Sequence, residues 1–184
     1  MGKQLFGQRY ETQPYTALGS IGELEIRFYP PSIKALTLGI KGKNHNFSKL
    51  FNYIAQGNTS GTKIAMTTPV YLEDEKGLAK MAFVLPQKYL HKKAPTPLCS
   101  DIKIATDSGG YFAALRFGGF NTQRKTDKQL YKLRCILKKK GIGTKGTGKI
   151  LGYNSPFTLV CRRNEVLFEV ERKTLPTSIL YELN

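Results

Sequence analysis

Hydrophobic and charged residues alternate in residues 23–29, where Leu24, Ile26 and Phe28 share one face and charged side chains occupy the other. A period of two is the signature of a half-buried β-strand, because successive side chains point to opposite faces of a sheet. Residues 33–40 continue in the same manner after two prolines. The pattern therefore predicts two consecutive strands near the start of the chain.

The period then changes to that of a helix. Phe47, Leu50, Phe51 and Ile54 follow the spacing i, i+3, i+4 and i+7, which places all of them on one helical face. A second helix is predicted over residues 126–141, followed by glycine-rich sequence. Its inner side carries Leu130, Leu133 and Leu137.

The same order of elements occurs twice, over about residues 23–86 and 100–172. In each half, a pair of predicted strands precedes a helix, and the next strand begins with Lys-Ile and reaches a proline, Pro69 or Pro156. A lone unit of this kind cannot cover its own sheet, so two are expected to pack together. We expect one α+β domain over residues 1–184, built on an antiparallel sheet or a distorted barrel.

The segment KIAMTTPV, residues 63–70, is apolar enough for a strand but contains a proline. Proline is tolerated at a sheet edge or a bulge, not within a central ladder. We therefore predict a broken strand whose Thr67 and Thr68 hydroxyls bond the backbone groups left unpaired. Such a break beside a helix would form a groove, and the alternative is a structural kink that holds no ligand.

Composition adds a large positive charge, since 29 Lys and Arg residues face 13 Asp and Glu residues and give a formal net charge of +16. This excess favours anionic partners, or serves only to keep the surface soluble. Much of it lies in residues 124–149, where Asp127 is the sole acidic residue. A nucleic-acid footprint is disfavoured there, because the segment lacks the interleaved aromatic residues of a single-strand binder.

Catalytic or metal-binding chemistry receives no support from residue spacing. His45 and His91 have no ligand neighbours, and Cys99, Cys135 and Cys161 lie too far apart for a zinc motif or a disulfide framework. The cysteines are expected to be reduced thiols of a cytoplasmic protein. No apolar run is long enough to serve as a signal peptide or a membrane span.

Six short motifs occur in a defined order: KIAMTTPV, AFVLP, APTP, RFGGF, YNSPF and RRNEV. Together they resemble the SOUL family of haem-binding proteins, from about Tyr10 to about Val170. The resemblance implies a distorted antiparallel barrel of a duplicated β-α-β unit, with two long helices packed outside. It also implies non-catalytic binding or carrying of haem or a related tetrapyrrole in an apolar groove.

The resemblance places the ligand between the first helix and the loop near the second proline-containing strand. The corresponding cofactor-binding residues here are Phe47, Leu50, Phe51, Ile54, Tyr153, Phe157 and Arg162. Aliphatic and aromatic walls suit a macrocycle, and a cation such as Arg162 suits its propionates. Where some relatives carry a histidine or basic residues this chain has Phe28, Asn44, Asn52 and Thr158, so haem is expected without an assigned axial ligand.

Two alternative functions remain open. The duplicated fold also resembles the small-molecule-binding domains of bacterial regulators, so the chain could sense or scavenge other flat hydrophobic ligands. The basic segment at residues 124–149 could instead bind nucleic acid or an acidic partner.

Overall fold

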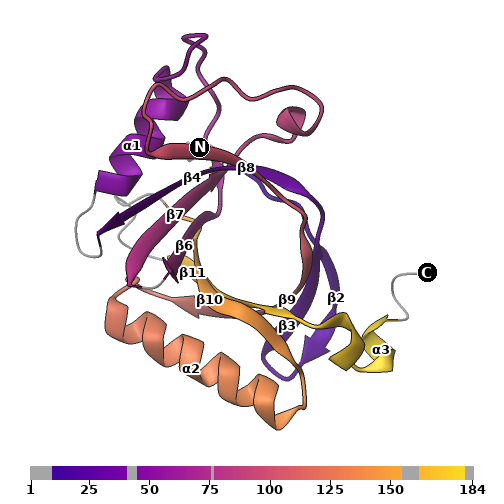
Figure 1. The fold of residues 1–184 in the computed structure, drawn as a ribbon. Helices are drawn as coiled ribbons and strands as arrows, with labels where there is room; N and C mark the ends of the chain where they lie inside the picture. The colour runs from indigo at the N-terminus through magenta and orange to yellow at the C-terminus, as the bar shows by residue number, and fades with distance from the viewer. Residues whose placement is uncertain (1–9, 41–44, 76, 155–161, 181–184) are drawn as a thin grey trace, which may run out of the picture.

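A computed structural model describes residues 10–40, 45–75, 77–154 and 162–180 of the chain. Within these residues, nine strands form one antiparallel sheet, and both long helices lie outside its curve (Figure 1). In spatial order the strands are β2 (Thr16–Ile21), β3 (Leu24–Tyr29), β9 (Gly110–Gly118), β11 (Arg163–Val170), β10 (Thr144–Gly152), β6 (Val70–Glu75), β7 (Leu78–Val84), β4 (Ser32–Ile40) and β8 (Ile102–Asp107). The helices are α1 (His45–Ala55), α2 (Gln123–Lys139) and the short α3 (Thr177–Leu180), with 3₁₀ turns η1 (Gln87–Leu90) and η2 (Arg172–Thr174).

The α+β prediction is confirmed, but the predicted barrel is not. The sheet twists into an almost circular section (Figure 1), yet within the described residues β2 and β8 are free edges that share no ladder. Alternation along a strand cannot reveal this difference, because an open curved sheet and a closed barrel bury the same faces.

The strand order has an internal symmetry. If β3, β4, β6 and β7 are exchanged for β8, β9, β10 and β11, the order from β3 to β8 reads the same from the opposite edge. Strand β2 lies outside this scheme and was not anticipated from the sequence. The duplicated unit remains a prediction, and this symmetric order supports it.

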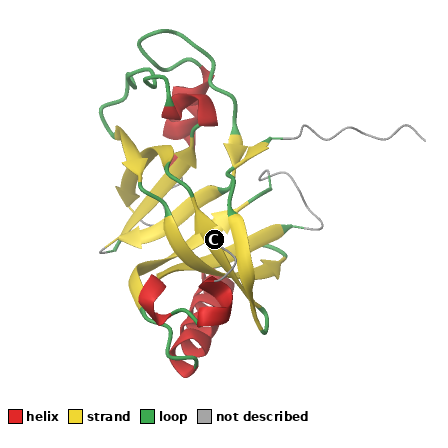
Figure 2. Cartoon of the chain, turned by 90° about the vertical axis from the view of Figure 1, so that its right-hand side faces the viewer, coloured by secondary structure: helices red, strands yellow, loops and turns green. Residues whose placement is uncertain are grey.

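Two apolar clusters cover the convex face of the sheet, one beneath each long helix. Helix α1 contributes Leu50, Tyr53 and Ile54 to a cluster with Phe83 of β7. Helix α2 packs through Leu133 and Leu137 onto β9 and β11. The two helices therefore cover separate parts of the sheet, at opposite ends of the molecule in Figure 2.

The concave face has its own apolar cluster, because alternate residues of the same strands point inward. Its buried members include Tyr29, Tyr71, Phe112, Leu151 and Leu167. Both faces of the central strands are thus buried, which explains why the sheet has more apolar positions than a single amphipathic layer needs.

The break predicted at Pro69 is present. Strand β5 (Thr67–Thr68) leaves the main sheet and pairs in parallel with β1 (Glu11–Thr12), and β6 begins directly after Pro69. The Thr67 hydroxyl donates to the carbonyl oxygen of Val84, as expected of a side chain that replaces a ladder bond. The Thr68 hydroxyl instead bonds the Thr12 hydroxyl at 3.1 Å.

Candidate functional site

Helix α1 is held firmly at both ends. Near its start, the Asn46 side chain donates to the carbonyl oxygen of Ala79 at 2.8 Å. Near its end, the Tyr53 hydroxyl donates to the carbonyl oxygen of Pro95 at 2.9 Å. Leu50 is completely buried between these anchors, so the helix presents a fixed surface beside it.

A row of aromatic rings leads from the core to the surface of α1. Phe83 contacts Phe47 edge-on, with ring centroids 5.4 Å apart, and Phe47 stacks on Phe51 with centroids 6.0 Å apart. Phe51 ends the row with 49% of its surface exposed. Removing an aromatic ring from water lowers the free energy of the system. This exposed face is therefore available for an apolar ligand.

An open groove lies against the C-terminal half of α1, with a volume of about 890 Å³. Phe51 and Ile54 line it from the helix, and Ile64 and Met66 line it from the segment before β5. The exposed Lys63 adds a positive charge to this lining.

Backbone and side-chain bonds position the second wall of the groove. The Ile64 amide donates to the carbonyl oxygen of Ile54 at 2.8 Å, which joins the segment to the end of α1. The Asn58 side chain donates to the carbonyl oxygens of Tyr53 and Thr62, at 3.1 and 2.8 Å. A buried asparagine thus closes the turn that brings the two walls together.

The predicted site residues on α1 fall into two groups. Phe51 and Ile54 line the groove, but Phe51 is half exposed whereas Ile54 is 4% exposed and belongs to the core cluster beneath the helix, as do Phe47 and Leu50. The helical pattern therefore placed these residues on one face but could not separate exposed from core-facing members, and their role in ligand binding remains a prediction.

The predicted residues from the second half of the chain do not meet this groove. Tyr153 packs into the concave-face cluster, with Tyr29 and Tyr71. The Arg162 guanidinium lies 4.8 Å from the ring centroid of Phe120. Phe157 falls outside the described residues, so the role of these three in ligand binding remains a prediction.

Ile64 and Met66 also line the groove but were not predicted to do so, because the pattern of residues 63–66 favours a strand. In the structure this segment precedes β5 and belongs to no strand. The proline six residues after Lys63 was the available signal, since a strand broken at Pro69 frees the residues before it to line a groove.

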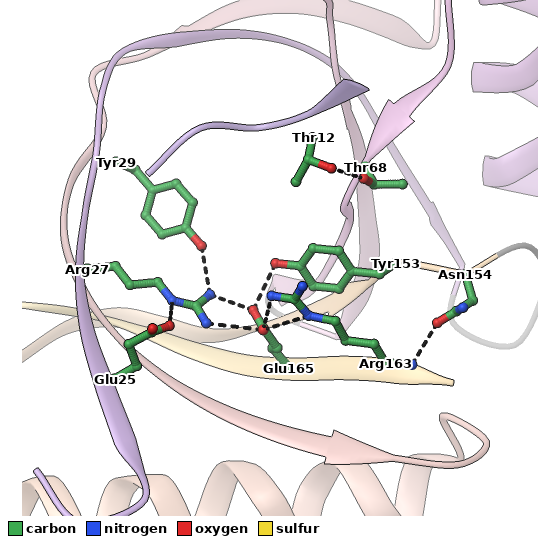
Figure 3. A network of polar contacts seen from close by, with 9 residues as sticks. All are labelled: Thr12, Glu25, Arg27, Tyr29, Thr68, Tyr153, Asn154, Arg163 and Glu165. Carbon is green, nitrogen blue, oxygen red and sulfur yellow. Dashed lines mark hydrogen bonds and ion pairs between the residues drawn. The ribbon is translucent and has the colours of Figure 1, made fainter. Parts of the chain in front are cut away.

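Tyr153 belongs to a buried polar network centred on Glu165, which is completely buried (Figure 3). Arg27 donates to the two Glu165 carboxylate oxygens at 2.6 and 3.1 Å, and Arg163 donates to Oε1 at 2.7 and 3.1 Å. The Tyr153 hydroxyl donates to Glu165 Oε2 at 2.8 Å. Arg27 also donates to the Tyr29 hydroxyl at 3.1 Å.

The pKa values of Glu165 and Tyr153 are set by burial and by their bonded partners in this network. Burial acts to raise the pKa of Glu165, but the hydrogen bonds and charge of Arg27, with the bonds from Arg163 and Tyr153, hold that pKa below its ordinary value. Burial raises the pKa of Tyr153, and the Glu165 charge adds to that shift. Glu165 is thus ionised and Tyr153 neutral at physiological pH, so the phenol donates to the carboxylate in a structural link between β3, β11 and the residue that follows β10.

The family model described as SOUL heme-binding protein matches residues 10–169. The chain belongs to this family. It is 31% identical over 158 residues to "Heme-binding protein 2" of Homo sapiens and 29% identical over 158 residues to the protein of that name in Mus musculus. Each match covers 79% of this chain and 77% of the relative.

Solved structures share the fold of this SOUL protein at low sequence identity. The C-terminal domain of EcmrR matches with a TM-score of 0.60 and 11% identity, over 85% of this chain and 98% of that one. A hydrolase from Listeria innocua matches with a TM-score of 0.54 and 9% identity, over 81% of this chain and 92% of that one. At these identities the likeness concerns the architecture alone.

The α1 groove of this SOUL protein suits the macrocycle of haem better than it suits a bare metal ion. No group of three or more His, Cys, Asp or Glu side chains within the described residues is arranged to hold a metal. The groove does contain two side chains of types that can ligate haem iron, the Met66 thioether and the Tyr10 phenol. His45 is exposed and does not line the groove.

None of the helices in the described part of the chain combines the length and apolar composition that crossing a membrane requires. Cys99 and Cys135 are free cysteines, and Cys161 lies outside the described residues.

Proposed function

We propose that this SOUL protein binds and carries haem or a related tetrapyrrole, without catalysis, in the groove beside α1. The observation that carries the proposal is the exposed ring of Phe51 over a groove of about 890 Å³. That volume falls in the range of about 300–1,000 Å³ found for small-molecule pockets. An aromatic ring that is half exposed in a folded protein gains most by covering another flat apolar surface.

The groove provides different chemistry for each part of a tetrapyrrole. The exposed ring of Phe51 and the partly buried Met66 offer apolar contact to the macrocycle, and the buried Ile54 and Ile64 support them from behind. Lys63 offers an ammonium group to a propionate, in a charge-assisted hydrogen bond. The formal net charge of +16 favours the approach of a ligand that carries two carboxylates.

A carrier role also agrees with the state of the ionisable groups. Glu165 and Tyr153 both have shifted pKa values, and the two groups are bonded to each other within the structural network. They are therefore engaged in stabilising the fold rather than poised for proton transfer. Free cysteine thiols are typical of a reducing compartment, so we propose that the carrier works in the cytoplasm.

Titration of the purified protein with haemin, followed at the Soret band, tests the proposal. We expect a saturable response, weakened at least about tenfold by Phe51→Asp because a charge replaces the apolar ring. Tyr131→Asp is the matched control, since Tyr131 is an exposed aromatic residue on α2, with 71% of its surface exposed. A non-saturating response, or equal affinities for the two variants, would contradict the proposal.

Metal-free protoporphyrin IX separates the two contributions to affinity. If the apolar walls dominate, protoporphyrin IX binds nearly as tightly as haemin and is equally sensitive to Phe51→Asp. If iron ligation contributes, haemin binds more tightly, and Met66→Leu or Tyr10→Phe shifts its Soret maximum.

A further inference from the structure

A second pocket lies on the concave face, away from α1, with a volume of about 350 Å³. We call it the mouth pocket, and its lining comes from β4, β6, β7, β8, β9, β10, β11 and the turn after β8. Leu36, Tyr71, Ala82 and Phe112 provide its apolar surface. It is therefore a concavity with an aromatic wall, as small flat ligands require.

The mouth pocket and the Glu165 network occupy different ends of the concave face. On β11, Glu165 belongs to the network and Glu169 to the pocket, and Leu167 lies between them. Leu151 of β10 likewise separates Lys149 from Tyr153, which follows directly after that strand. Four residues of strand span about 13 Å, so the two polar regions are divided by an apolar layer.

The carboxylates of the mouth pocket already have partners. Asp107 accepts from Lys34 Nζ at 2.6 Å and from the Gly109 amide at 2.8 Å. Gly109 has a φ of +72°, and a Cβ there would lie 2.1 Å from the carbonyl oxygen of Tyr29, so the turn that orients Asp107 depends on glycine. Lys34 is consequently held in place at the pocket.

Glu73 is engaged in the same way, with Lys80 at 3.4 Å and the Thr147 hydroxyl at 2.7 Å. Glu169 lies 3.8 Å from Lys145, whose side chain is 57% exposed. The acidic groups around the pocket therefore do not need a further cation.

Lys149 is the exception among these charges. Its ammonium group lies 5.2 Å from the ring centroid of Phe112, and within the described residues it has no hydrogen bond or ion pair. Burial lowers the pKa of Lys34, the Asp107 charge opposes that shift, and the Lys149 charge adds to it. The Lys149 charge also lowers the pKa of Asp107, so both lysines face this carboxylate, but only Lys34 is bonded to it.

We propose that the mouth pocket binds a small carboxylate carried on a flat apolar body, with the carboxylate between Lys149 and Lys34 and the apolar part against Tyr71 and Phe112. The structure already positions a partner for each interaction. Lys34 is bonded to Asp107, Lys149 has no hydrogen bond or ion pair within the described residues, and the rings of Tyr71 and Phe112 line the pocket. Binding here does not depend on the α1 groove, so this proposal and the haem proposal can succeed or fail separately.

Amide NMR of the haem-free protein, titrated with benzoate, benzamide and benzylammonium, tests this assignment. These three probes share a ring and differ in charge. We expect benzoate to shift the signals of β6, β8 and β10 saturably, and benzamide to bind at least about tenfold more weakly, because it lacks the charge-assisted bonds. Preferential binding of benzylammonium, equal binding of all three, or benzoate shifts concentrated at α1 would overturn the proposal.

Lys149→Gln is the decisive variant, with Lys128→Gln as the matched control. Both changes remove one positive charge, but Lys128 is exposed on α2, and no residue of α2 lines the pocket. Benzoate affinity is expected to fall at least about tenfold in Lys149→Gln and to stay unchanged in Lys128→Gln. Lys149→Arg should restore benzoate binding in part. Similar thermal unfolding midpoints for all variants would establish that they fold. Equal benzoate affinities of the two Gln variants would refute the assignment.

Discussion

The α1 groove and the Glu165 network both combine aromatic and charged side chains. The network is buried, whereas the groove leaves Phe51 half exposed. In the network, Arg27 packs on the ring of Tyr15 at 4.2 Å, and each charged group is satisfied inside the protein. Beside α1, the aromatic row runs outward and leaves Phe51 half exposed. Aromatic and charged residues contribute to stability where their partners are internal, and they provide binding capacity where a partner is missing.

The largest expected effect comes from breaking the network. Glu165→Gln removes the carboxylate that neutralises buried Arg27, so the variant should lose about 3–5 kcal/mol of unfolding free energy, the usual cost of an unpaired buried charge. Urea denaturation measures this loss. Haem affinity, corrected for the folded fraction, should remain unchanged because the network does not line the groove.

The control for that experiment is Glu23→Gln. Glu23 pairs with Lys132 at 2.6 Å, but both side chains are about half exposed, at 50% and 46%. Exposed pairs contribute less than about 1 kcal/mol, so this variant should be nearly as stable as the wild type. Equal losses in Glu165→Gln and Glu23→Gln would remove the distinction between the two regions.

An intermediate effect should separate neighbouring residues of α1. Leu50→Ala opens a cavity in the core and is expected to cost about 2–5 kcal/mol, whereas Phe51→Ala removes an exposed ring and should cost less than about 1 kcal/mol. Haemin titration should show the reverse order, with the greater loss of affinity in Phe51→Ala. If Phe51→Ala proves as destabilising as Leu50→Ala, Phe51 belongs to the core and the groove is not a free surface.

The smallest effect concerns acid pH. Because the folded pKa of Glu165 lies below its ordinary value of 4.5, the ionised carboxylate contributes stability above that value, and the contribution is lost as the pH falls through the folded pKa. Unfolding free energies from about pH 7 to about pH 3 should therefore decline at the acid end. The decline should be shallower in Glu165→Gln, and parallel curves for the two proteins would show that Glu165 does not set the acid limit.

Strong local periodicity predicted most of the fold. The alternation of Leu24, Ile26 and Phe28 located β3, and the helical stripe from Phe47 to Ile54 located α1 within a few residues. Strand β2 escaped prediction because it is an edge strand that pairs only with β3, across a tight turn, and only Leu18 is fully buried in it. A strand that buries so little has a weak pattern.

The candidate site was predicted only in part, for a different reason. Periodicity places Leu50 and Phe51 on the same face, although one is buried and the other is 49% exposed. A helical face is wider than the surface that any one neighbour covers, so the sequence cannot tell which flank remains open. Lys149 was likewise counted among the basic residues of a surface segment, whereas its strand turns it onto the concave face.

The sequence by itself determined the elements, the break at Pro69 and the membership of the SOUL family, because these depend on local pattern and on ordered motifs. Within the described residues, tertiary structure alone decided that the sheet stays open, that Tyr153 joins Glu165 rather than the α1 groove, and that Lys149 lines the same pocket as Lys34 but is bonded to no carboxylate. These outcomes depend on which distant strands become neighbours and on which face of each strand meets solvent. Both are settled only when the two halves of the chain pack together.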